Sequence, residues 1–324
     1  MDQARPSLPD LVAERRMIPS DTDGIALQLI GRRRRDMESF TPERTLLLMH
    51  GATFPSESLF DVPVGGFSFM DALARAGYDV WGLDARGYGG STRPPEMAAP
   101  PEANPPLIPA RVALQDLRAA VDFLRQHRAV PQVNLLGMSW GATVAGAYAA
   151  AYGETVGKLM LVTPLWLSDG PRRIDPGGPL GAYRLANPDA FEAAWRVAAP
   201  EEKRDELIPP GWFDAWKQIT LATDPDTPSP GTIRAPAGAV QDTREHWAAN
   251  NPLYEPSVIR SPVLIVAAEW DIDTPLAMTH DLFTRLINAP RKRFVEIGEG
   301  THMLLMEKNR GQAFDAVIGF LGES

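Results

Sequence analysis

Along the chain, short apolar runs alternate with segments of helical spacing, which predicts a sheet covered by helices. Three strands are expected within residues 14–50, where Asp23 and Gly24 mark a hairpin. The third, residues 44–50, is a continuous apolar run, typical of a strand buried on both faces. Later strands are expected at 78–84, 132–138, 158–164, 262–268 and 292–298, and helices at 69–77, 110–128, 140–152, 276–288 and 310–322. The order predicts an α/β fold with a mostly parallel sheet and helices on both faces.

One long segment, residues 167–255, interrupts this alternation and shows no strand pattern. Its tryptophans indicate a packed unit, because disordered segments are poor in aromatic residues. We therefore predict a helical cap or lid at 167–255, inserted into a core formed by residues 1–166 and 256–324. Short helical stretches, separated by Pro and Gly, are expected in this cap near 188–198, 211–222 and 239–249.

Composition and charge narrow the class of protein. The 324 residues, 44% of them hydrophobic, are enough for one large α/β domain with an insertion. A net charge of −9 weighs against nucleic acid as a partner, and we interpret the basic run Arg32–Arg35 as a solvated strand end near Glu38 and Glu43. The absence of cysteine excludes disulfides and thiolate chemistry. No signal-peptide core or membrane-spanning stretch is seen, so a soluble, cytoplasmic protein is expected.

The stretch Gly137-Met138-Ser139-Trp140-Gly141 matches the G-x-S-x-G nucleophile elbow. In this motif a serine sits on a strained turn from strand to helix, and small residues flank it because the two backbones approach closely. The pentapeptide alone arises by chance in roughly one chain in ten of this length. Its position, directly after a predicted strand and before a predicted helix, makes Ser139 a candidate nucleophile.

A serine hydroxyl needs a base and an orienting acid to act as a nucleophile. His302 follows the last predicted strand and can reach the carboxyl edge of the sheet, where ligands bind in open α/β sheets, so we interpret it as the base. Asp271, after the strand at 262–268, is assigned as the acid, with Asp273 as the alternative. Asp273 and Thr274 precede a predicted helix, and we interpret them as its N-cap.

The order Ser139, Asp271, His302 resembles that of the α/β-hydrolase family of serine hydrolases. The resemblance covers about residues 14–322 and implies eight strands, the second antiparallel, with the cap inserted after the sixth. Besides the elbow, the stretches similar to the family's motifs are HGAT at 50–53, GLDARGYGGST at 82–92, AAEWDIDTP at 267–275 and GTHMLLMEK at 300–308. The positions matching loop-bracing residues of the family are His50, Asp84 and Arg86.

The resemblance assigns catalytic roles residue by residue. It makes Ser139 the nucleophile, Asp271 the acid and His302 the base, and it places the oxyanion hole at the backbone N–H groups of Ala52 and Trp140. It implies neither a metal nor a cofactor. The side chains expected to contact substrate are Thr53, Phe54, Trp140, Trp166 and Met303.

The resemblance implies that a carboxylic ester, lactone or thioester is hydrolysed through an acyl-enzyme, on a small-molecule substrate with an apolar group. The rate is then expected to rise with pH near the pKa of about 6–7 of a free imidazole. The elbow is similar to that of proline iminopeptidases, but their HGGPG loop is replaced by HGATF at 50–54, which weighs against a peptidase. The alternatives are a C–C bond hydrolase or an amidase on the same triad, a non-catalytic ligand receptor, and a cofactor-free lyase or perhydrolase.

Overall fold

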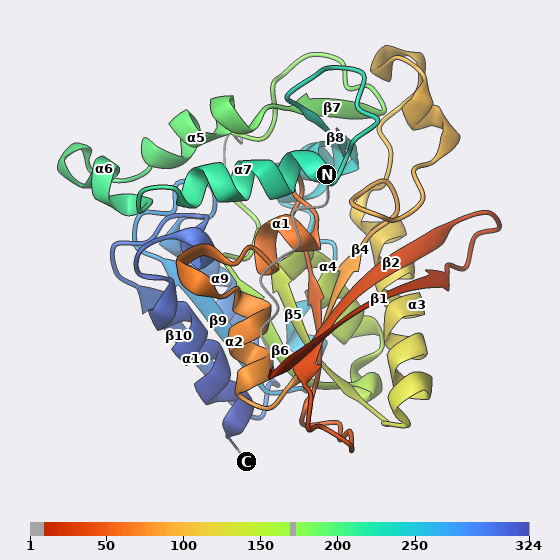
Figure 1. Ribbon diagram of the computed structural model, residues 1–324, viewed down its shortest axis with the longest axis vertical. Helices are drawn as coiled ribbons and strands as arrows, with labels where there is room; N and C mark the ends of the chain where they lie inside the picture. The colour runs from red at the N-terminus through yellow and green to blue at the C-terminus, as the bar shows by residue number, and fades with distance from the viewer. Residues whose placement is uncertain (1–9, 169–172, 324) are drawn as a thin grey trace.

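The computed structural model describes residues 10–168 and 173–323, and its centre is an eight-stranded sheet of order β1-β2-β4-β3-β5-β6-β9-β10 (Figure 1). Strand β2 pairs antiparallel with β1 and β4, and every other ladder of this sheet is parallel. The predicted mostly parallel sheet with an antiparallel second strand is therefore confirmed; the ends of the predicted core, residues 1 and 324, lie outside the described residues. The strands are β1 (Leu11–Pro19), β2 (Ala26–Arg34), β3 (Thr45–Met49), β4 (Asp79–Asp84), β5 (Val133–Met138), β6 (Val156–Val162), β9 (Val263–Ala268) and β10 (Lys292–Ile297).

Helices cover both faces of the sheet, as the pattern predicted. Residues of α3, α4 and α9 share a buried cluster with one face, and residues of α2 and α10 share a second cluster with the other. Strand β3 shows the division, since Leu47 and Met49 belong to the first cluster and Leu46 and Leu48 to the second. The helices are α1 (Ser56–Phe60), α2 (Phe69–Arg75), α3 (Ala110–Arg128), α4 (Trp140–Ala151), α9 (Leu276–Arg285) and α10 (Arg310–Gly322). Short 3-10 turns lie at Val64–Gly66, Pro95–Ala98, Pro101–Ala103, Gly153–Thr155, Glu201–Lys203, Pro256–Val258 and Leu304–Met306.

Between β6 and β9 the chain forms a two-stranded antiparallel sheet as well as helices, which corrects the expectation of a purely helical segment. Its strands have four residues each, too few for an alternating pattern to stand out in the sequence. In Figure 1 this segment lies across one end of the large sheet, above the strand ends that carry the candidate site. Its elements are β7 (Tyr183–Ala186), α5 (Pro188–Arg196), α6 (Arg204–Leu207), α7 (Trp212–Ala222), β8 (Ile233–Pro236), α8 (Gly238–Asp242) and a π-helical turn (Thr243–Trp247).

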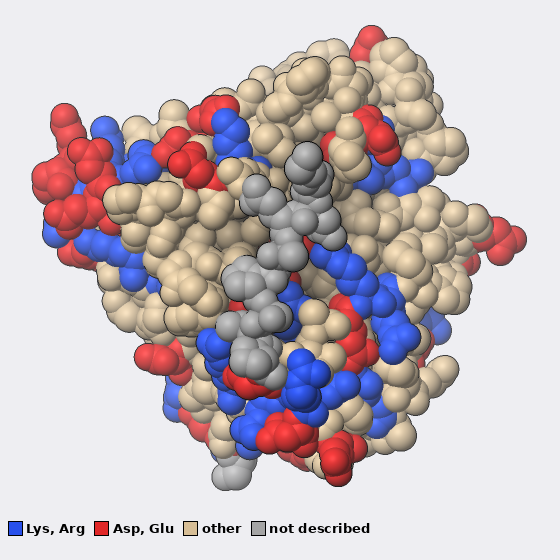
Figure 2. All heavy atoms as spheres, viewed as in Figure 1, with Lys and Arg blue, Asp and Glu red and all other residues tan. Residues whose placement is uncertain are grey.

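Three arginines of the basic run Arg32–Arg35 pair with carboxylates, which are not those of the sequence neighbours Glu38 and Glu43. Figure 2 shows basic and acidic groups interspersed on the face that it draws. The ion pairs are Arg32 with Asp61 (2.7 Å) and Asp71 (3.2 Å), Arg33 with Glu14 (2.9 Å), and Arg34 with Asp36. No helix in the described part of the chain combines the length and the apolar character needed to cross a membrane.

Candidate active site

Ser139 occupies a strained turn between β5 and α4. Its backbone has φ 58° and ψ −122°, a conformation that non-glycine residues rarely adopt. The flanking glycines permit the turn: a Cβ on Gly137 would lie 2.2 Å from the carbonyl oxygen of Gly141, and a Cβ on Gly141 would lie 2.2 Å from that of His50. The close passage of β5, α4 and the loop after β3 thus explains why the motif needs Gly at both ends.

The structure brings together the three residues predicted from the sequence. Nε2 of His302 lies 2.9 Å from Oγ of Ser139, and Nδ1 of His302 lies 2.8 Å from Oδ2 of Asp271. With Nδ1 donating to the carboxylate, Nε2 of a neutral imidazole is free to accept the serine proton. The loops after β5, β9 and β10 each supply one member of this chain of hydrogen bonds.

Asp271 is buried and its carboxylate is fully hydrogen-bonded. Besides His302, Oδ1 accepts the N–H groups of Asp273 and Thr274, both at 2.8 Å, and Oδ2 accepts the Thr274 hydroxyl at 2.6 Å. Burial favours a higher pKa for Asp271, but the charge of His302 and these hydrogen bonds hold the pKa below its usual value. Asp271 therefore stays ionised beside the imidazole.

The predicted N-cap role of Asp273 and Thr274 is wrong. Helix α9 begins after Pro275, and no side chain caps it. Thr274 instead bonds to Asp271, and the carboxylate of Asp273 pairs with Arg173 at 3.6 Å. The tight turn that delivers N–H groups to Asp271 uses both residues before the helix can start.

The proton affinity of His302 is high. Burial alone would lower the pKa of its imidazole, but Asp271, followed by Asp273 and Glu307, raises it to about 9. This value lies above that of the free imidazole on which the expected pH dependence rested.

Glu307 is a buried carboxylate that sequence reasoning did not single out. It accepts the N–H of Thr301 at 2.8 Å and the indole N–H of Trp195 at 2.6 Å. Burial raises the pKa of Glu307 to about 7. Because Thr301 precedes His302 and Trp195 belongs to α5, this carboxylate ties the helix above the sheet to the histidine loop.

Of the two expected oxyanion donors, Trp140 directly follows Ser139 in the chain and Ala52 directly follows Gly51. The loop at Gly51 passes beside Ser139, since a Cβ on Gly51 would lie 3.5 Å from the Cβ of Ser139. Among the hydrogen bonds of residues 10–168 and 173–323, none has the N–H of Ala52 or Trp140 as donor. The carbonyl of Ala52, in contrast, accepts the hydroxyl of Tyr88 at 2.9 Å, which fixes the orientation of this residue.

His50, Asp84 and Arg86 each connect loops at this end of the sheet, the arrangement expected of them. Burial lowers the pKa of His50, which stays neutral. Their bonds join His50 to the Gly51 carbonyl (2.7 Å) and the Ala85 N–H (3.1 Å), Asp84 to the N–H groups of Ser56 (2.9 Å) and Gly90 (3.2 Å), and Nε of Arg86 to Oδ1 of Asp116 (2.8 Å). The remaining histidines, His127, His246 and His280, do not line the cavity described next.

Ser139 and His302 open onto a cavity of about 380 Å³, a volume typical of small-molecule sites. Thr53, Phe54 and Met303, three of the side chains expected to contact substrate, line this cavity. Further wall residues come from the segment above the sheet and include Arg173, Ile174, Arg184, Asn187, Phe191 and Trp195. Phe191 and Trp195 had a signal in the sequence, the i, i+4 spacing on one helix face. Arg184 had none, because strand β7 was not predicted.

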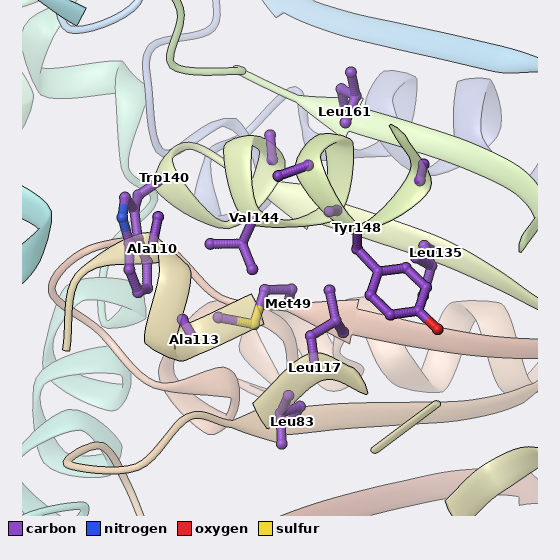
Figure 3. Packing of buried hydrophobic residues seen from close by; sticks show 14 of the residues in the cluster. Met49, Leu83, Ala110, Ala113, Leu117, Leu135, Trp140, Val144, Tyr148 and Leu161 are labelled. Atoms are coloured by element: carbon purple, nitrogen blue, oxygen red, sulfur yellow. The ribbon is translucent and has the colours of Figure 1, made fainter. Parts of the chain in front are cut away.

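The expected contacts of Trp140 and Trp166 with substrate are not met, because neither indole lines the cavity. The Trp140 side chain packs beside Ala110 (Figure 3), and its Nε1 donates to Oδ2 of Asp242 at 3.0 Å. The same oxygen accepts the N–H of Ala110 at 2.7 Å, and burial raises the pKa of Asp242 to about 6. The Trp166 indole donates to Asp281 at 2.9 Å. Both indoles are fully buried and serve packing.

One cluster of potential metal ligands exists among the described residues, formed by Asp271, Asp273 and His302 within 4.8 Å of one another. Its members are already engaged: both ring nitrogens of His302 and both oxygens of Asp271 take part in protein hydrogen bonds, and Asp273 pairs with Arg173. The donor set fits a proton-transfer chain better than a metal site.

Comparison with known proteins agrees with this architecture. Residues 45–201 match the family model described as alpha/beta hydrolase fold. No curated protein matches the chain. Similar solved structures include a thermophilic esterase from Thermogutta terrifontis (19% identity, 95% of this chain and 98% of that one, TM-score 0.63), a hydrolase from Pseudomonas aeruginosa PA01 (17%, 98% and 100%, 0.64) and a thioesterase domain from the curacin biosynthetic pathway (17%, 96% and 99%, 0.59). The chain has the α/β-hydrolase fold.

Proposed function

We propose that this protein is a serine hydrolase that cleaves a carboxylic ester, lactone or thioester of a small molecule through an acyl-enzyme on Ser139. The observation that carries the proposal is the continuous hydrogen-bonded chain from Asp271 through His302 to Ser139, at a strained elbow facing a cavity. The names of the esterase and the thioesterase with the same fold support hydrolysis as the reaction class.

In the acylation step Nε2 of His302 takes the hydroxyl proton while Oγ of Ser139 attacks the acyl carbon. Asp271 holds the imidazole in the required tautomer and stabilises the imidazolium that forms. The N–H groups of Ala52 and Trp140 donate to the developing oxyanion, and losing one such donor costs about 3 kcal/mol of barrier. As the tetrahedral intermediate collapses, the bond to the leaving alcohol or thiol breaks and His302 returns the proton to that group.

Deacylation repeats the same proton transfers with water. His302 removes a proton from a water molecule, whose oxygen attacks the acyl carbon bound to Ser139. Collapse of the second intermediate breaks the bond to Oγ, and the serine recovers its proton from His302. Both steps use the same hydrogen-bonded chain of Asp271, His302 and Ser139.

We also propose that residues 167–255 act as a cap on a core of residues 1–166 and 256–324. The cavity supports this division, because its walls combine residues of the loop after β3 with residues of β7 and α5. Phe54, Phe191 and Trp195 give the cavity aromatic surface, and Phe54 and Phe191 meet edge to face with centroids 4.8 Å apart. An apolar part of the substrate fits against these rings.

A substrate panel tests the reaction class, with Ser139→Ala as the blank. We expect neutral short-chain aryl esters to be turned over by the wild-type protein and the variant to be slower by at least about 10⁴-fold. An aminoacyl amide and a vinylogous diketone in the same panel test amide and C–C cleavage. Circular dichroism of the variant checks that it is folded. Undiminished ester turnover by folded Ser139→Ala would refute the proposal.

A further inference from the structure

Arg184 reaches from strand β7 into the candidate active site. Its Nη2 donates to the carbonyl of Ala52 at 2.9 Å and to the hydroxyl oxygen of Thr53 at 2.8 Å. The side chain also lines the cavity that Ser139 and His302 share. A cation of the inserted segment therefore lies beside the residue whose N–H is proposed for the oxyanion hole.

The charge of Arg184 is not balanced by any carboxylate of the described residues, and its Nε is buried without a hydrogen-bond partner. Burial lowers the pKa of Arg184, which reflects the cost of holding this charge away from water. Other arginines of low exposure are compensated. Arg86 pairs with Asp116, Arg128 with Asp79 (2.8 Å) and Arg234 with Asp224 (2.6 Å), while Arg310 lies over the rings of Phe67, Trp212 and Phe314.

The second arginine of the cavity provides the sharpest contrast. Arg173 also lines the wall, but it pairs with Asp273 at 3.6 Å and donates to the Ala194 carbonyl at 3.1 Å. Arg184 keeps Nε and Nη1 without protein partners in the part of the chain that the structure describes. Nη1 carries two N–H groups, which can donate charge-assisted hydrogen bonds to an anion in the cavity.

We propose that Arg184 binds a carboxylate of the substrate, so that the preferred substrate is an ester that also carries a free carboxylate close to the scissile bond. This inference rests on the proposed function. One unbalanced guanidinium charge with the Thr53 hydroxyl beside it matches the one negative charge of a carboxylate. Because Arg184 contacts Ala52 directly, the carboxylate and the reacting carbonyl are separated by only a short chain.

The test compares an anionic ester with a neutral one of similar shape. Phenyl hemisuccinate carries the carboxylate, and the phenyl ester of succinamic acid replaces it by an amide. The readout is the ratio of their kcat/KM values in the wild-type protein, in Arg184→Met and in Arg184→Lys, with Arg173→Met as the matched control. Charge-assisted hydrogen bonds predict that the ratio falls about tenfold to a hundredfold in Arg184→Met. The ratio should recover partly in Arg184→Lys and change much less in Arg173→Met.

Equal losses on both esters in Arg184→Met would overturn the inference, because Arg184 would then only hold the loop of Ala52. An unchanged ratio in Arg184→Met would also overturn the inference. In either case, neutral-ester turnover that still depends on Ser139 would leave the proposed function intact. A binding measurement tests the carboxylate site without relying on turnover. Calorimetry with free glutarate should show binding to Ser139→Ala and a loss of at least about tenfold in affinity when Arg184→Met is added. Equal affinity in the two proteins would refute the carboxylate site.

Discussion

The sheet core and the segment inserted above it differ in how strongly local pattern dictates their structure. In the core, β5 is buried at all six positions and its two parallel ladders fix the strand that leads into Ser139. In the insertion, β7 and β8 have four residues each, and helix α7 buries only Trp216 and Thr220. The core thus holds the candidate catalytic groups, and the insertion supplies cavity walls and the unpaired cation that we propose to distinguish one substrate from another.

After the loss expected for Ser139→Ala, the next largest effect expected in the core is a shift of the pH dependence. The reaction needs a neutral imidazole, so kcat/KM rises with pH through the pKa of His302. With that pKa raised to about 9, the rate at pH 7 should be about a hundredfold below its alkaline plateau. Asp271→Asn should move the midpoint down, because the carboxylate is what raises the pKa. A wild-type midpoint at or below about 6.5 would contradict the coupling between these two residues.

A smaller expected effect is the loss of stability when the close packing around the turn at Ser139 is disturbed. Gly141→Ala places a Cβ 2.2 Å and 2.4 Å from the carbonyl oxygens of His50 and Met49, which are backbone atoms and cannot turn aside. We expect the free energy of unfolding to fall by about 1–3 kcal/mol or more. The control is Gly319→Ala in α10, where no atom lies within 4 Å of the new Cβ and stability should rise by about 0.5–1 kcal/mol. Urea unfolding measures the stability of both variants. Equal stabilities would show that the turn at Ser139 can accommodate a Cβ at position 141.

The smallest expected effect lies where the two regions join. Asp242 of α8 accepts hydrogen bonds from the Trp140 indole and the Ala110 N–H, and burial raises its pKa in the folded protein from the ordinary 3.8 to about 6. A carboxyl group with a raised pKa stabilises the fold most below about pH 4, and this stability is lost as pH rises through about 6. Asp242→Asn keeps one acceptor oxygen and cannot ionise. The difference in unfolding free energy between wild type and variant should therefore change by about 1–3 kcal/mol between pH 4 and 7. A difference independent of pH would show that Asp242 is not held in an apolar setting.

The sequence predicted the core and the candidate catalytic residues because strong local rules act there. Gly137 and Gly141 mark a backbone approach that excludes a Cβ, and the strand ends before Asp271 and His302 lead to one edge of a parallel sheet. The pattern could not place the indoles of Trp140 and Trp166, since a tryptophan packs equally well against a core or a ligand. Strand β7 and the proposed role of Arg184 could not be predicted from the sequence, for a different reason. A strand of four residues is too short to show a periodic pattern. That no carboxylate of the described residues pairs with Arg184 becomes visible only when the chain has folded and its neighbours are known.

The central claim, that Ser139 is the nucleophile activated by His302, is tested most directly by covalent labelling. The protein is incubated with a fluorophosphonate, which reacts with activated serine hydroxyls, and the adduct is located by mass spectrometry of the intact chain and its peptides. We predict one adduct per chain, on Ser139, and no adduct on folded Ser139→Ala. An unlabelled wild-type protein, or an adduct on another residue that persists in Ser139→Ala, would contradict the account.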